Sequence, residues 1–218
     1  VWWEHLKRAT ALVREESGVD MRGVKAVGIS YQMHGLVIVS RDLEPLRPSI
    51  IWCDSRAVSV GDEAFSSLGE GTCMGHLLNS PGNFTASKLA WVKVNEPLLY
   101  RRIHKMMLPG DYLAMRMTGE VTTTPSGLSE MVLWDFSREG VAEAVLDHYG
   151  ISADLLPEVR PTFSVQGGLT ASAAGELGLA PGTPVSYRAG DQPTNAFSLK
   201  VLHPGEAAAN AGTSGVVY

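Results

Sequence analysis

The most informative stretch of the sequence is residues 24–35, Val24-Lys25-Ala26-Val27-Gly28-Ile29-Ser30-Tyr31-Gln32-Met33-His34-Gly35. Its first seven residues alternate in part between apolar and smaller or polar side chains, a pattern that predicts a buried strand. The polar run that follows lies just beyond the end of that strand. In α/β proteins the functional sites lie beyond the carboxyl ends of strands, so this segment is a candidate site if the fold is α/β.

Two further segments combine a predicted strand end with polar groups. They are Gly190-Asp191-Gln192, which follows the predicted strand 185–189, and Gly212-Thr213-Ser214-Gly215, which precedes the apolar run 216–218. Each has a plain structural alternative. A Gly-Asp pair is typical of a turn, a lone histidine is often a hydrogen-bonded structural residue, and a glycine-rich run fits an ordinary hairpin loop as well as a phosphate cradle.

Periodicity and turn residues predict the other elements. The predicted strands 24–30, 36–39 and 48–52 follow one another closely, which indicates an antiparallel meander. A further short strand is expected at 105–108, followed by a turn in which Asp111 is the N-cap of a helix. The predicted helices are one that starts at Trp2, one from Thr85 to just before Pro97, and 112–117, 141–149, 171–179 and 194–201.

Composition bounds the function. The 218 residues are 44% hydrophobic and 19% charged, which is typical of a globular chain. The net charge of −5 argues against nucleic acid as a partner. Cys53 and Cys73 stand apart, so neither a disulfide framework nor a zinc site is expected, and a reducing, cytoplasmic setting fits best. No apolar run reaches the roughly 20 residues that cross a membrane.

The ends of the chain and its later part suggest how it is organised. It begins at Val1 within a helical pattern and stops at Tyr218 within an apolar run, which predicts an internal piece of a longer protein. The Pro- and Gly-rich stretch 157–168 and the small helix after it are the expected connection between two domains. The predicted division is therefore 1–184 and 185–218.

Seven motifs that follow one another along the chain are more specific together than any one of them alone. They are Trp2-Trp3, the run 28–35, residues 46–56 with Trp52-Cys53-Asp54-Ser55-Arg56, Gly82-Asn83-Phe84-Thr85-Ala86-Ser87-Lys88-Leu89, residues 108–113 with Met117-Thr118-Gly119-Glu120, residues 189–192 and residues 211–215. With these motifs the sequence resembles the FGGY family of carbohydrate kinases over essentially its whole length. The Gln32-Met33-His34-Gly35 run is similar to that of the xylulokinases within the family.

The resemblance implies an actin-like, RNase H-like ATPase fold, here incomplete: most of the N-terminal, sugar-binding domain and the beginning of the C-terminal, ATP-binding domain. It implies that ATP and Mg²⁺ are the cofactors. It also implies that Asp191 is the base that accepts the proton of the attacking sugar hydroxyl, which suits a reaction dominated by positioning and charge stabilisation. The plain alternative is that Asp191 caps the helix predicted from residue 194.

The resemblance also implies which residues contact the substrates. Met33 and His34 match positions that contact a ketose, although core packing remains an alternative for the Met33 side chain. Gln192 follows the base where many xylulokinases carry Asn and glycerol kinases carry Gln, so another substrate stays open. The run Gly212, Thr213, Ser214 and Gly215 matches a turn that receives the terminal phosphates of ATP.

Other polar residues near these motifs have plainer explanations. Lys88 is interpreted as structural or solvated. Asp54 and Gln32 offer hydrogen bonds to a sugar, but a surface pair of Asp54 with Arg56 is preferred. The family's magnesium-directed hairpin is expected before Val1 and the adenosine site after Tyr218, so the chain alone should not turn over.

The expected activity is ATP-dependent phosphorylation of a ketopentose, D-xylulose to D-xylulose 5-phosphate. A sugar and ATP are the expected partners, and a homodimer is an open option for assembly. The alternatives are another polyol or sugar-acid kinase of the same family, or a non-catalytic sugar-binding relative.

Overall fold

A computed structural model describes residues 1–211 and 215–217. Its helices are α1 (Trp2–Ser17), α2 (Val58–Leu68), α3 (Glu70–Thr72), α4 (Thr85–Asn95), α5 (Pro97–Tyr100), α6 (Pro109–Thr118), α7 (Pro125–Met131), α8 (Glu143–Tyr149), α9 (Ala171–Leu177) and α10 (Asp191–Ser198), with short turns η1 (Met21–Gly23), η2 (Cys73–Leu77) and η3 (Ala153–Leu155). Its strands are β1 (Val27–Tyr31), β2 (Val37–Val39), β3 (Lys105–Met107), β4 (Thr122–Thr123), β5 (Trp134–Asp135), β6 (Gly140–Val141), β7 (Glu158–Val159), β8 (Val185–Gly190), β9 (Ala209–Ala211) and β10 (Gly215–Val217).

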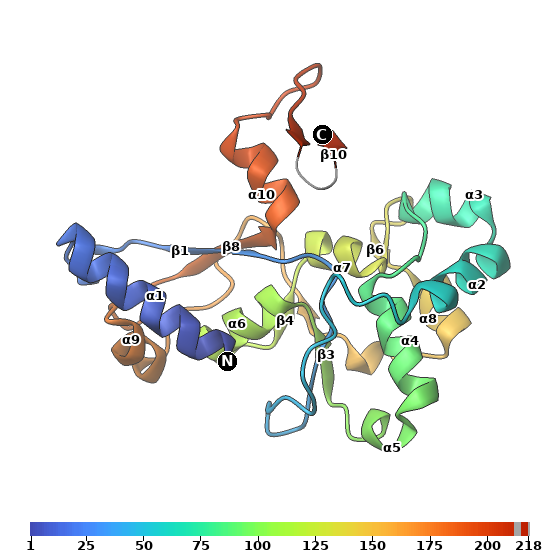
Figure 1. The fold of residues 1–218 in the computed structure, drawn as a ribbon, viewed down its shortest axis with the longest axis horizontal. Coiled ribbons are helices and arrows are strands. Elements are labelled where there is room, and N and C mark those ends of the chain that lie inside the picture. The colour runs from blue at the N-terminus through green and yellow to red at the C-terminus, as the bar shows by residue number, and fades with distance from the viewer. Residues whose placement is uncertain (212–214, 218) are drawn as a thin grey trace.

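A parallel pair of strands lies at the centre of the fold. β1 and β8 run side by side, with Tyr31 opposite Gly190 at their carboxyl ends (Figure 1). Because the strands are parallel, the loop after β1 and the segment after β8 leave from the same edge. The predicted polar runs at residues 32–35 and 190–192 are therefore brought together by this register.

The expected antiparallel meander is wrong for the first of its three strands and holds in part for the other two segments. β1 pairs with β8 rather than with β2, and β2 pairs antiparallel with β3. Residues 48–52 form no strand, but isolated antiparallel bridges join Ile50 to Leu36 and Pro45 to Val39. Pro48 has no N–H to donate, and both Ile51 and Trp52 are exposed, so this segment meets only the edge of β2.

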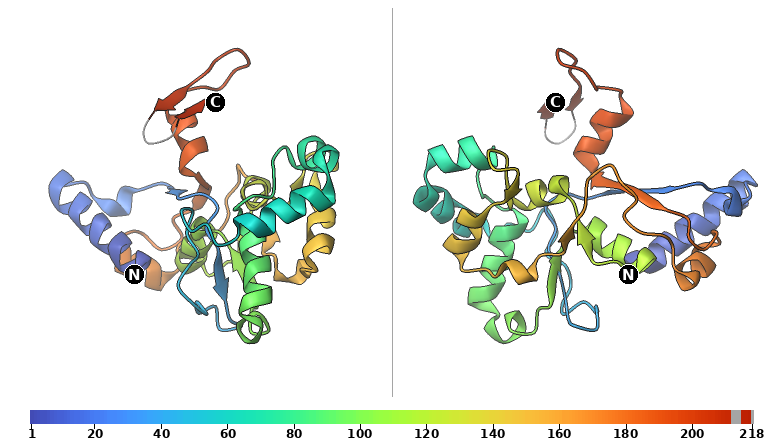
Figure 2. Two further views of the ribbon diagram at one scale, coloured as in Figure 1. Left: turned by 45° about the vertical axis from the view of Figure 1, so that its right-hand side comes forward. Right: turned by 180° about the vertical axis from the view of Figure 1, so that it is seen from behind.

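Helices pack at both ends of the central strands (Figures 1 and 2). At one end α1 lies against α9, where the Trp3 indole donates a hydrogen bond to Glu176 at 2.9 Å. At the other end α2, α4, α5 and α8 form a second group, with α6 and α7 between the two groups. A continuous apolar core runs through the molecule, including Ile29 of β1, Leu89 of α4 and Leu128 of α7.

Two helices begin earlier than predicted, and each has a proline in its first turn. α6 begins at Pro109, so Asp111 is the third helical residue rather than the N-cap, and its carboxylate accepts a hydrogen bond from the Leu108 N–H at 3.2 Å. α10 begins at Asp191 rather than at Thr194, with Pro193 in its first turn. The first N–H groups of a helix have no intrahelical partner, so proline is tolerated there.

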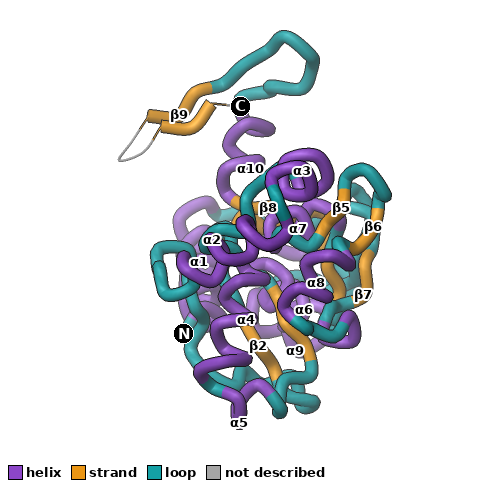
Figure 3. Tube along the Cα trace, turned by 90° about the vertical axis from the view of Figure 1, so that its right-hand side faces the viewer, coloured by secondary structure: helices purple, strands orange, loops and turns teal. Residues whose placement is uncertain are grey.

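α10 rises from the carboxyl end of β8 and leads to the β9–β10 hairpin, which projects away from the remainder of the molecule (Figures 2 and 3). Before that point β8 is anchored by a buried ion pair. The Arg188 guanidinium lies 2.9 Å from the Asp111 carboxylate of α6 and donates a hydrogen bond to the Thr122 carbonyl at 2.6 Å. Both charged side chains are about 1% exposed. Among residues 1–211 and 215–217, no helix has the length and apolar character to span a bilayer.

Candidate functional site

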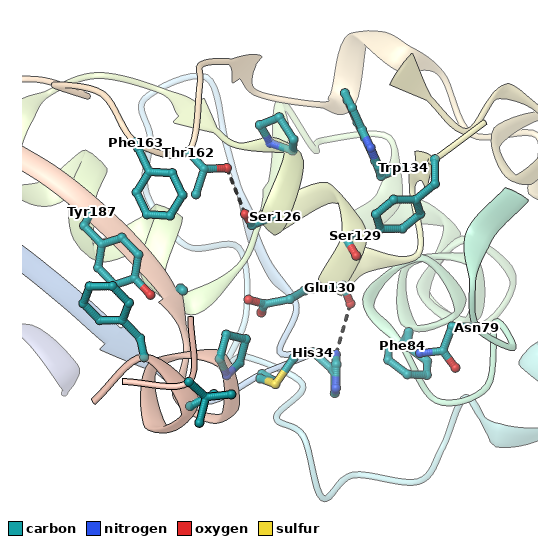
Figure 4. A pocket seen from close by; sticks show the side chains of 18 residues that line it. His34, Asn79, Phe84, Ser126, Ser129, Glu130, Trp134, Thr162, Phe163 and Tyr187 are labelled. Carbon is teal, nitrogen blue, oxygen red and sulfur yellow. Dashed lines mark hydrogen bonds between the residues drawn. The ribbon is translucent and has the colours of Figure 1, made fainter. Parts of the chain in front are cut away.

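A pocket of about 660 Å³ opens at the carboxyl edge of β1 and β8. Its wall combines residues from the loop after β1, from β8, from α7 and from α10 (Figure 4). The polar side chains that line it are His34, Asn79, Ser126, Ser129, Glu130, Thr162 and Tyr187, and the apolar ones include Met33, Phe84, Trp134, Phe163 and Phe197. This mixture of apolar walls and a few convergent polar groups is typical of a small-molecule site.

The pocket holds His34 in a defined orientation. The imidazole Nδ1 lies 3.0 Å from the carbonyl oxygen of Glu130, and the ring meets the edge of Phe84 at a centroid distance of 4.2 Å (Figure 4). A carbonyl oxygen only accepts hydrogen bonds, so Nδ1 carries the hydrogen. Burial lowers the pKa of His34 below its usual value; the hydrogen bond to the Glu130 carbonyl opposes this shift, and the neighbouring Lys88 charge adds a smaller lowering. The ring is therefore neutral near pH 7, and Nε2 is left as a hydrogen-bond acceptor.

Lys88 of α4 contacts the backbone of the same loop. Its ammonium group donates a hydrogen bond to the His34 carbonyl oxygen at 2.8 Å, and its side chain is fully buried. Burial lowers the pKa of Lys88 to about 8. The structural interpretation of Lys88 is therefore confirmed, and the solvated alternative is wrong.

Met33 lies in the pocket wall against the backbone of β8. An added Cβ at Gly190 would lie 2.4 Å from the Met33 Cγ, a distance that real side chains do not tolerate. Glycine is thus required at residue 190 for Met33 to pack there. Met33 lines the pocket and also packs, so the two alternatives for its side chain are compatible.

Asp191 lies beside the pocket rather than in its wall. It is the first residue of α10, its side chain is exposed, and its Oδ1 accepts a hydrogen bond from the Gln192 N–H at 3.0 Å. Burial dominates the pKa shifts of His34 and Glu130, and the negative charge of Asp191 adds a smaller effect that favours the protonated form of each. The structural alternative is wrong as stated, because the N-cap of α10 is Gly190; Asp191 instead lies in the first turn, where a carboxylate is favoured.

Glu130 is the most deeply embedded of the polar pocket residues that sequence reasoning missed. It lies on α7, is 6% exposed, and its Oε1 accepts hydrogen bonds from the Gly190 N–H at 2.8 Å and the Tyr31 hydroxyl at 3.2 Å. Burial, above all, raises the pKa of Glu130 to about 8. The one signal in the sequence is a carboxylate directly before the apolar run 131–133.

The remaining predicted residues lie elsewhere. Asp54 pairs with Arg56 at 2.7 Å, which confirms the preferred explanation. The side-chain oxygen of Gln32 accepts a hydrogen bond from the Trp52 N–H at 3.0 Å.

The predicted phosphate-binding run falls largely outside the described residues. Gly212, Thr213 and Ser214 are among those left out, whereas Gly215 begins β10. Within the described ranges, no group of three histidine, cysteine or acidic side chains is placed to hold a metal ion.

Comparison with known proteins covers the whole chain. It is 34% identical over 219 residues to the xylulose kinase of Streptomyces rubiginosus and 31% identical over 217 residues to that of Escherichia coli strain K12. In both cases the match covers 100% of this chain and 44% of the relative. The chain thus spans about 44% of the length of these curated relatives.

Solved structures of sugar kinases are also similar to this chain. The crystal structure of a xylulose kinase from Brucella ovis matches with a TM-score of 0.85 and 29% identity, covering 95% of this chain and 42% of that one. The xylulose kinase of Rhodospirillum rubrum matches with a TM-score of 0.90 over 99% of this chain and 44% of that one, at 24% identity, which supports the fold alone.

These likenesses confirm the predicted α/β, actin-like sugar-kinase fold, of which this chain forms a part. The family model described as the FGGY family of carbohydrate kinases, N-terminal domain, matches residues 1–198. This chain therefore belongs to the FGGY family of carbohydrate kinases.

Proposed function

We propose that the full-length protein is an ATP-dependent kinase that phosphorylates a ketopentose, D-xylulose to D-xylulose 5-phosphate, with Asp191 as the general base. The observation that carries this proposal is the parallel register of β1 and β8. It brings the loop of Met33 and His34 and the first turn of α10 to one edge, beside a pocket of suitable size for a sugar.

In the proposed reaction a terminal hydroxyl of the sugar attacks the γ-phosphorus of ATP. The new bond joins the sugar oxygen to phosphorus, the bond to the bridging oxygen of ADP breaks, and the hydroxyl proton passes to the Asp191 carboxylate. The neutral His34 accepts a hydrogen bond from a second sugar hydroxyl at Nε2, which fixes the sugar without adding charge. Gln192, next to the base, is proposed as a further sugar contact.

ATP and Mg²⁺ are proposed as the phosphoryl donor and its counter-ion. When bound, Mg²⁺ would offset the negative charge of the phosphates. The described residues supply no three-ligand metal cluster, so no step of the proposal depends on a metal site within them. The run Gly212, Thr213, Ser214 and Gly215 is proposed to bind the terminal phosphates, and a cytoplasmic location and homodimeric assembly remain predictions.

Sugar-dependent release of ADP tests the activity. The full-length protein is assayed with ATP and a panel of ketopentoses, glycerol and sugar acids, and the ratios of kcat/KM identify the substrate. If no compound of the panel increases the rate of ADP release, the kinase assignment is refuted.

The role of Asp191 is tested by Asp191→Asn. We expect kcat to fall on the order of 10²–10⁴-fold, the usual contribution of general base catalysis, with sugar affinity changed little. The matched control is Glu143→Gln, because Glu143 is also an exposed acid in the first turn of a helix but belongs to α8, which does not start at the carboxyl edge of β1 and β8. Equal turnover in Asp191→Asn and the control would reject the base assignment.

A second substrate class has one observation in its favour. Gln192 is the residue that glycerol kinases carry after the base, so another polyol is the alternative acceptor. The same panel decides between them: a kcat/KM for glycerol or a sugar acid above that for D-xylulose would replace the ketopentose assignment.

A further inference from the structure

Glu130 contacts both halves of the candidate site, yet the reaction described above gives it no role. We propose that Glu130 is a positioning residue: its carboxyl group holds the backbone from which Asp191 extends, and its backbone carbonyl holds the ring of His34. This inference rests on the proposed function, because positioning matters only if Asp191 and His34 act on a bound substrate.

The first part of the argument is the contact to β8. The Gly190 N–H is the last donor of the strand before Asp191, and it donates to Glu130 Oε1 at 2.8 Å. The same oxygen accepts the Tyr31 hydroxyl at 3.2 Å, so the ends of β1 and β8 are joined through one carboxyl oxygen. A Cβ at Gly190 would lie 2.9 Å from Glu130 Oε1 and 2.4 Å from Met33 Cγ. The Gly190 backbone is therefore clamped between two side chains.

The second part is the contact to the loop after β1. The carbonyl oxygen of Glu130 accepts the hydrogen of His34 Nδ1 at 3.0 Å, which fixes the tautomer and the direction of the ring. In Figure 4 the Glu130 side chain extends across the middle of the pocket, while its carbonyl faces His34. A single residue of α7 thus orients two groups. Its backbone holds His34, which is proposed to contact the sugar, and its side chain holds the backbone next to Asp191, the proposed base.

The third part is the charge of the carboxyl group. Its pKa of about 8 makes it predominantly neutral near pH 7, so it accepts hydrogen bonds without placing a second negative charge beside Asp191. Glutamine has the same shape, keeps an Oε1 acceptor and carries no charge. Glu130→Gln should therefore preserve the arrangement, whereas Glu130→Ala removes the acceptor and leaves two buried donors unpaired.

This division of labour predicts that the two kinetic constants respond differently. Removal of the side chain frees the Gly190 backbone and hence Asp191, but it leaves the backbone carbonyl that orients His34. A loss of kcat with little change in the KM for the sugar is therefore expected, since a small displacement of a reacting group is enough to cost about 10²-fold in rate. A purely structural role would lower stability without this split.

The experiment compares the full-length protein with Glu130→Gln, Glu130→Ala and Val145→Ala. Val145 is fully buried on α8 away from the pocket, so its variant controls for lost core packing alone. We expect Glu130→Ala to lower kcat on the order of 10- to 100-fold with KM within about threefold, and Glu130→Gln to remain within about threefold in both. Val145→Ala should lower Tm with an unchanged kcat.

A second readout does not depend on turnover. Hydrogen exchange of the Gly190 amide, followed in protein labelled with ¹⁵N-glycine, should be faster in Glu130→Ala and unchanged in Glu130→Gln. Wild-type exchange in Glu130→Ala, or equal losses of kcat in the alanine and glutamine variants, would overturn the inference. If no sugar stimulates the wild-type protein, the proposed function fails, and the exchange rates still decide whether Glu130 holds Gly190.

Discussion

Glu130→Gln should change how the folding stability of the full-length protein depends on pH. In the folded protein the pKa of Glu130 is about 8, above its usual 4.5, mainly because burial penalises the carboxylate. The nearby charges of Asp111 and Asp191 add to this effect, while the hydrogen bonds from Gly190 and Tyr31 oppose it. A group whose pKa is higher in the folded than in the unfolded protein stabilises the folded state. This contribution is complete below the unfolded-state pKa and is lost as the pH rises through the folded-state pKa. Wild-type protein should thus lose stability between pH 4.5 and about 8.

The size of the effect follows from the two pKa values. At about 1.4 kcal/mol per pKa unit, the interval from 4.5 to about 8 corresponds to an upper limit of about 5 kcal/mol. Local relaxation and water entry reduce such penalties, so we expect about 3 kcal/mol. Glutamine cannot ionise, and its variant should keep this stability as the pH rises.

Urea unfolding measured at about pH 5 and about pH 9 gives the free energy of unfolding of each protein. The free energy of unfolding of Glu130→Gln relative to that of wild type should be about 3 kcal/mol higher at about pH 9 than at about pH 5, since all other titrating groups are shared. Glu143→Gln, at an exposed position in the first turn of α8, should follow wild type. A constant difference between Glu130→Gln and wild type at both pH values would refute the reasoning.

Two further substitutions test the supports of the site. Lys88→Met removes the donor to the His34 carbonyl, so the sugar KM should rise roughly tenfold while kcat stays within about threefold; an unchanged KM would show that the loop holds itself. Arg188→Met leaves the Asp111 carboxylate buried without its partner and should cost about 3–5 kcal/mol in urea unfolding. Arg188→Met combined with Asp111→Leu should cost less than Arg188→Met alone, and a larger cost would contradict the ion-pair argument.

Local patterns predicted six of the helices and the strands β1, β2, β3 and β8 but not the strand partners, and they missed α2 and α7. The strand near Val27 and the strand that begins at Val185 follow from apolar runs that end in polar and glycine residues. Their parallel pairing depends on packing between distant parts of the chain, which no local pattern contains. The predicted pairing of β1 with β2 failed for the same reason, because proximity along the sequence was taken as proximity in the sheet.

The candidate site divides in a similar way. Met33, His34 and Asp191 were predicted from their positions after strands and from the family resemblance, and the register brings these positions to one edge. Glu130 and Lys88 were not assigned to the site: Glu130 lies on α7, which no pattern predicted, and Lys88 was interpreted as structural or solvated. Only the folded arrangement shows that Lys88 is enclosed under the histidine loop and that Glu130 meets the ends of two strands.

The backbone of His34 limits how this site can be redesigned. Its φ of 60° lies in the left-handed region, which asparagine and glycine enter at low cost and β-branched residues avoid. A library meant to broaden acceptor range at this position should favour asparagine over valine, isoleucine or threonine. A β-branched residue at position 34 would strain the backbone whatever contacts its side chain made with a ligand.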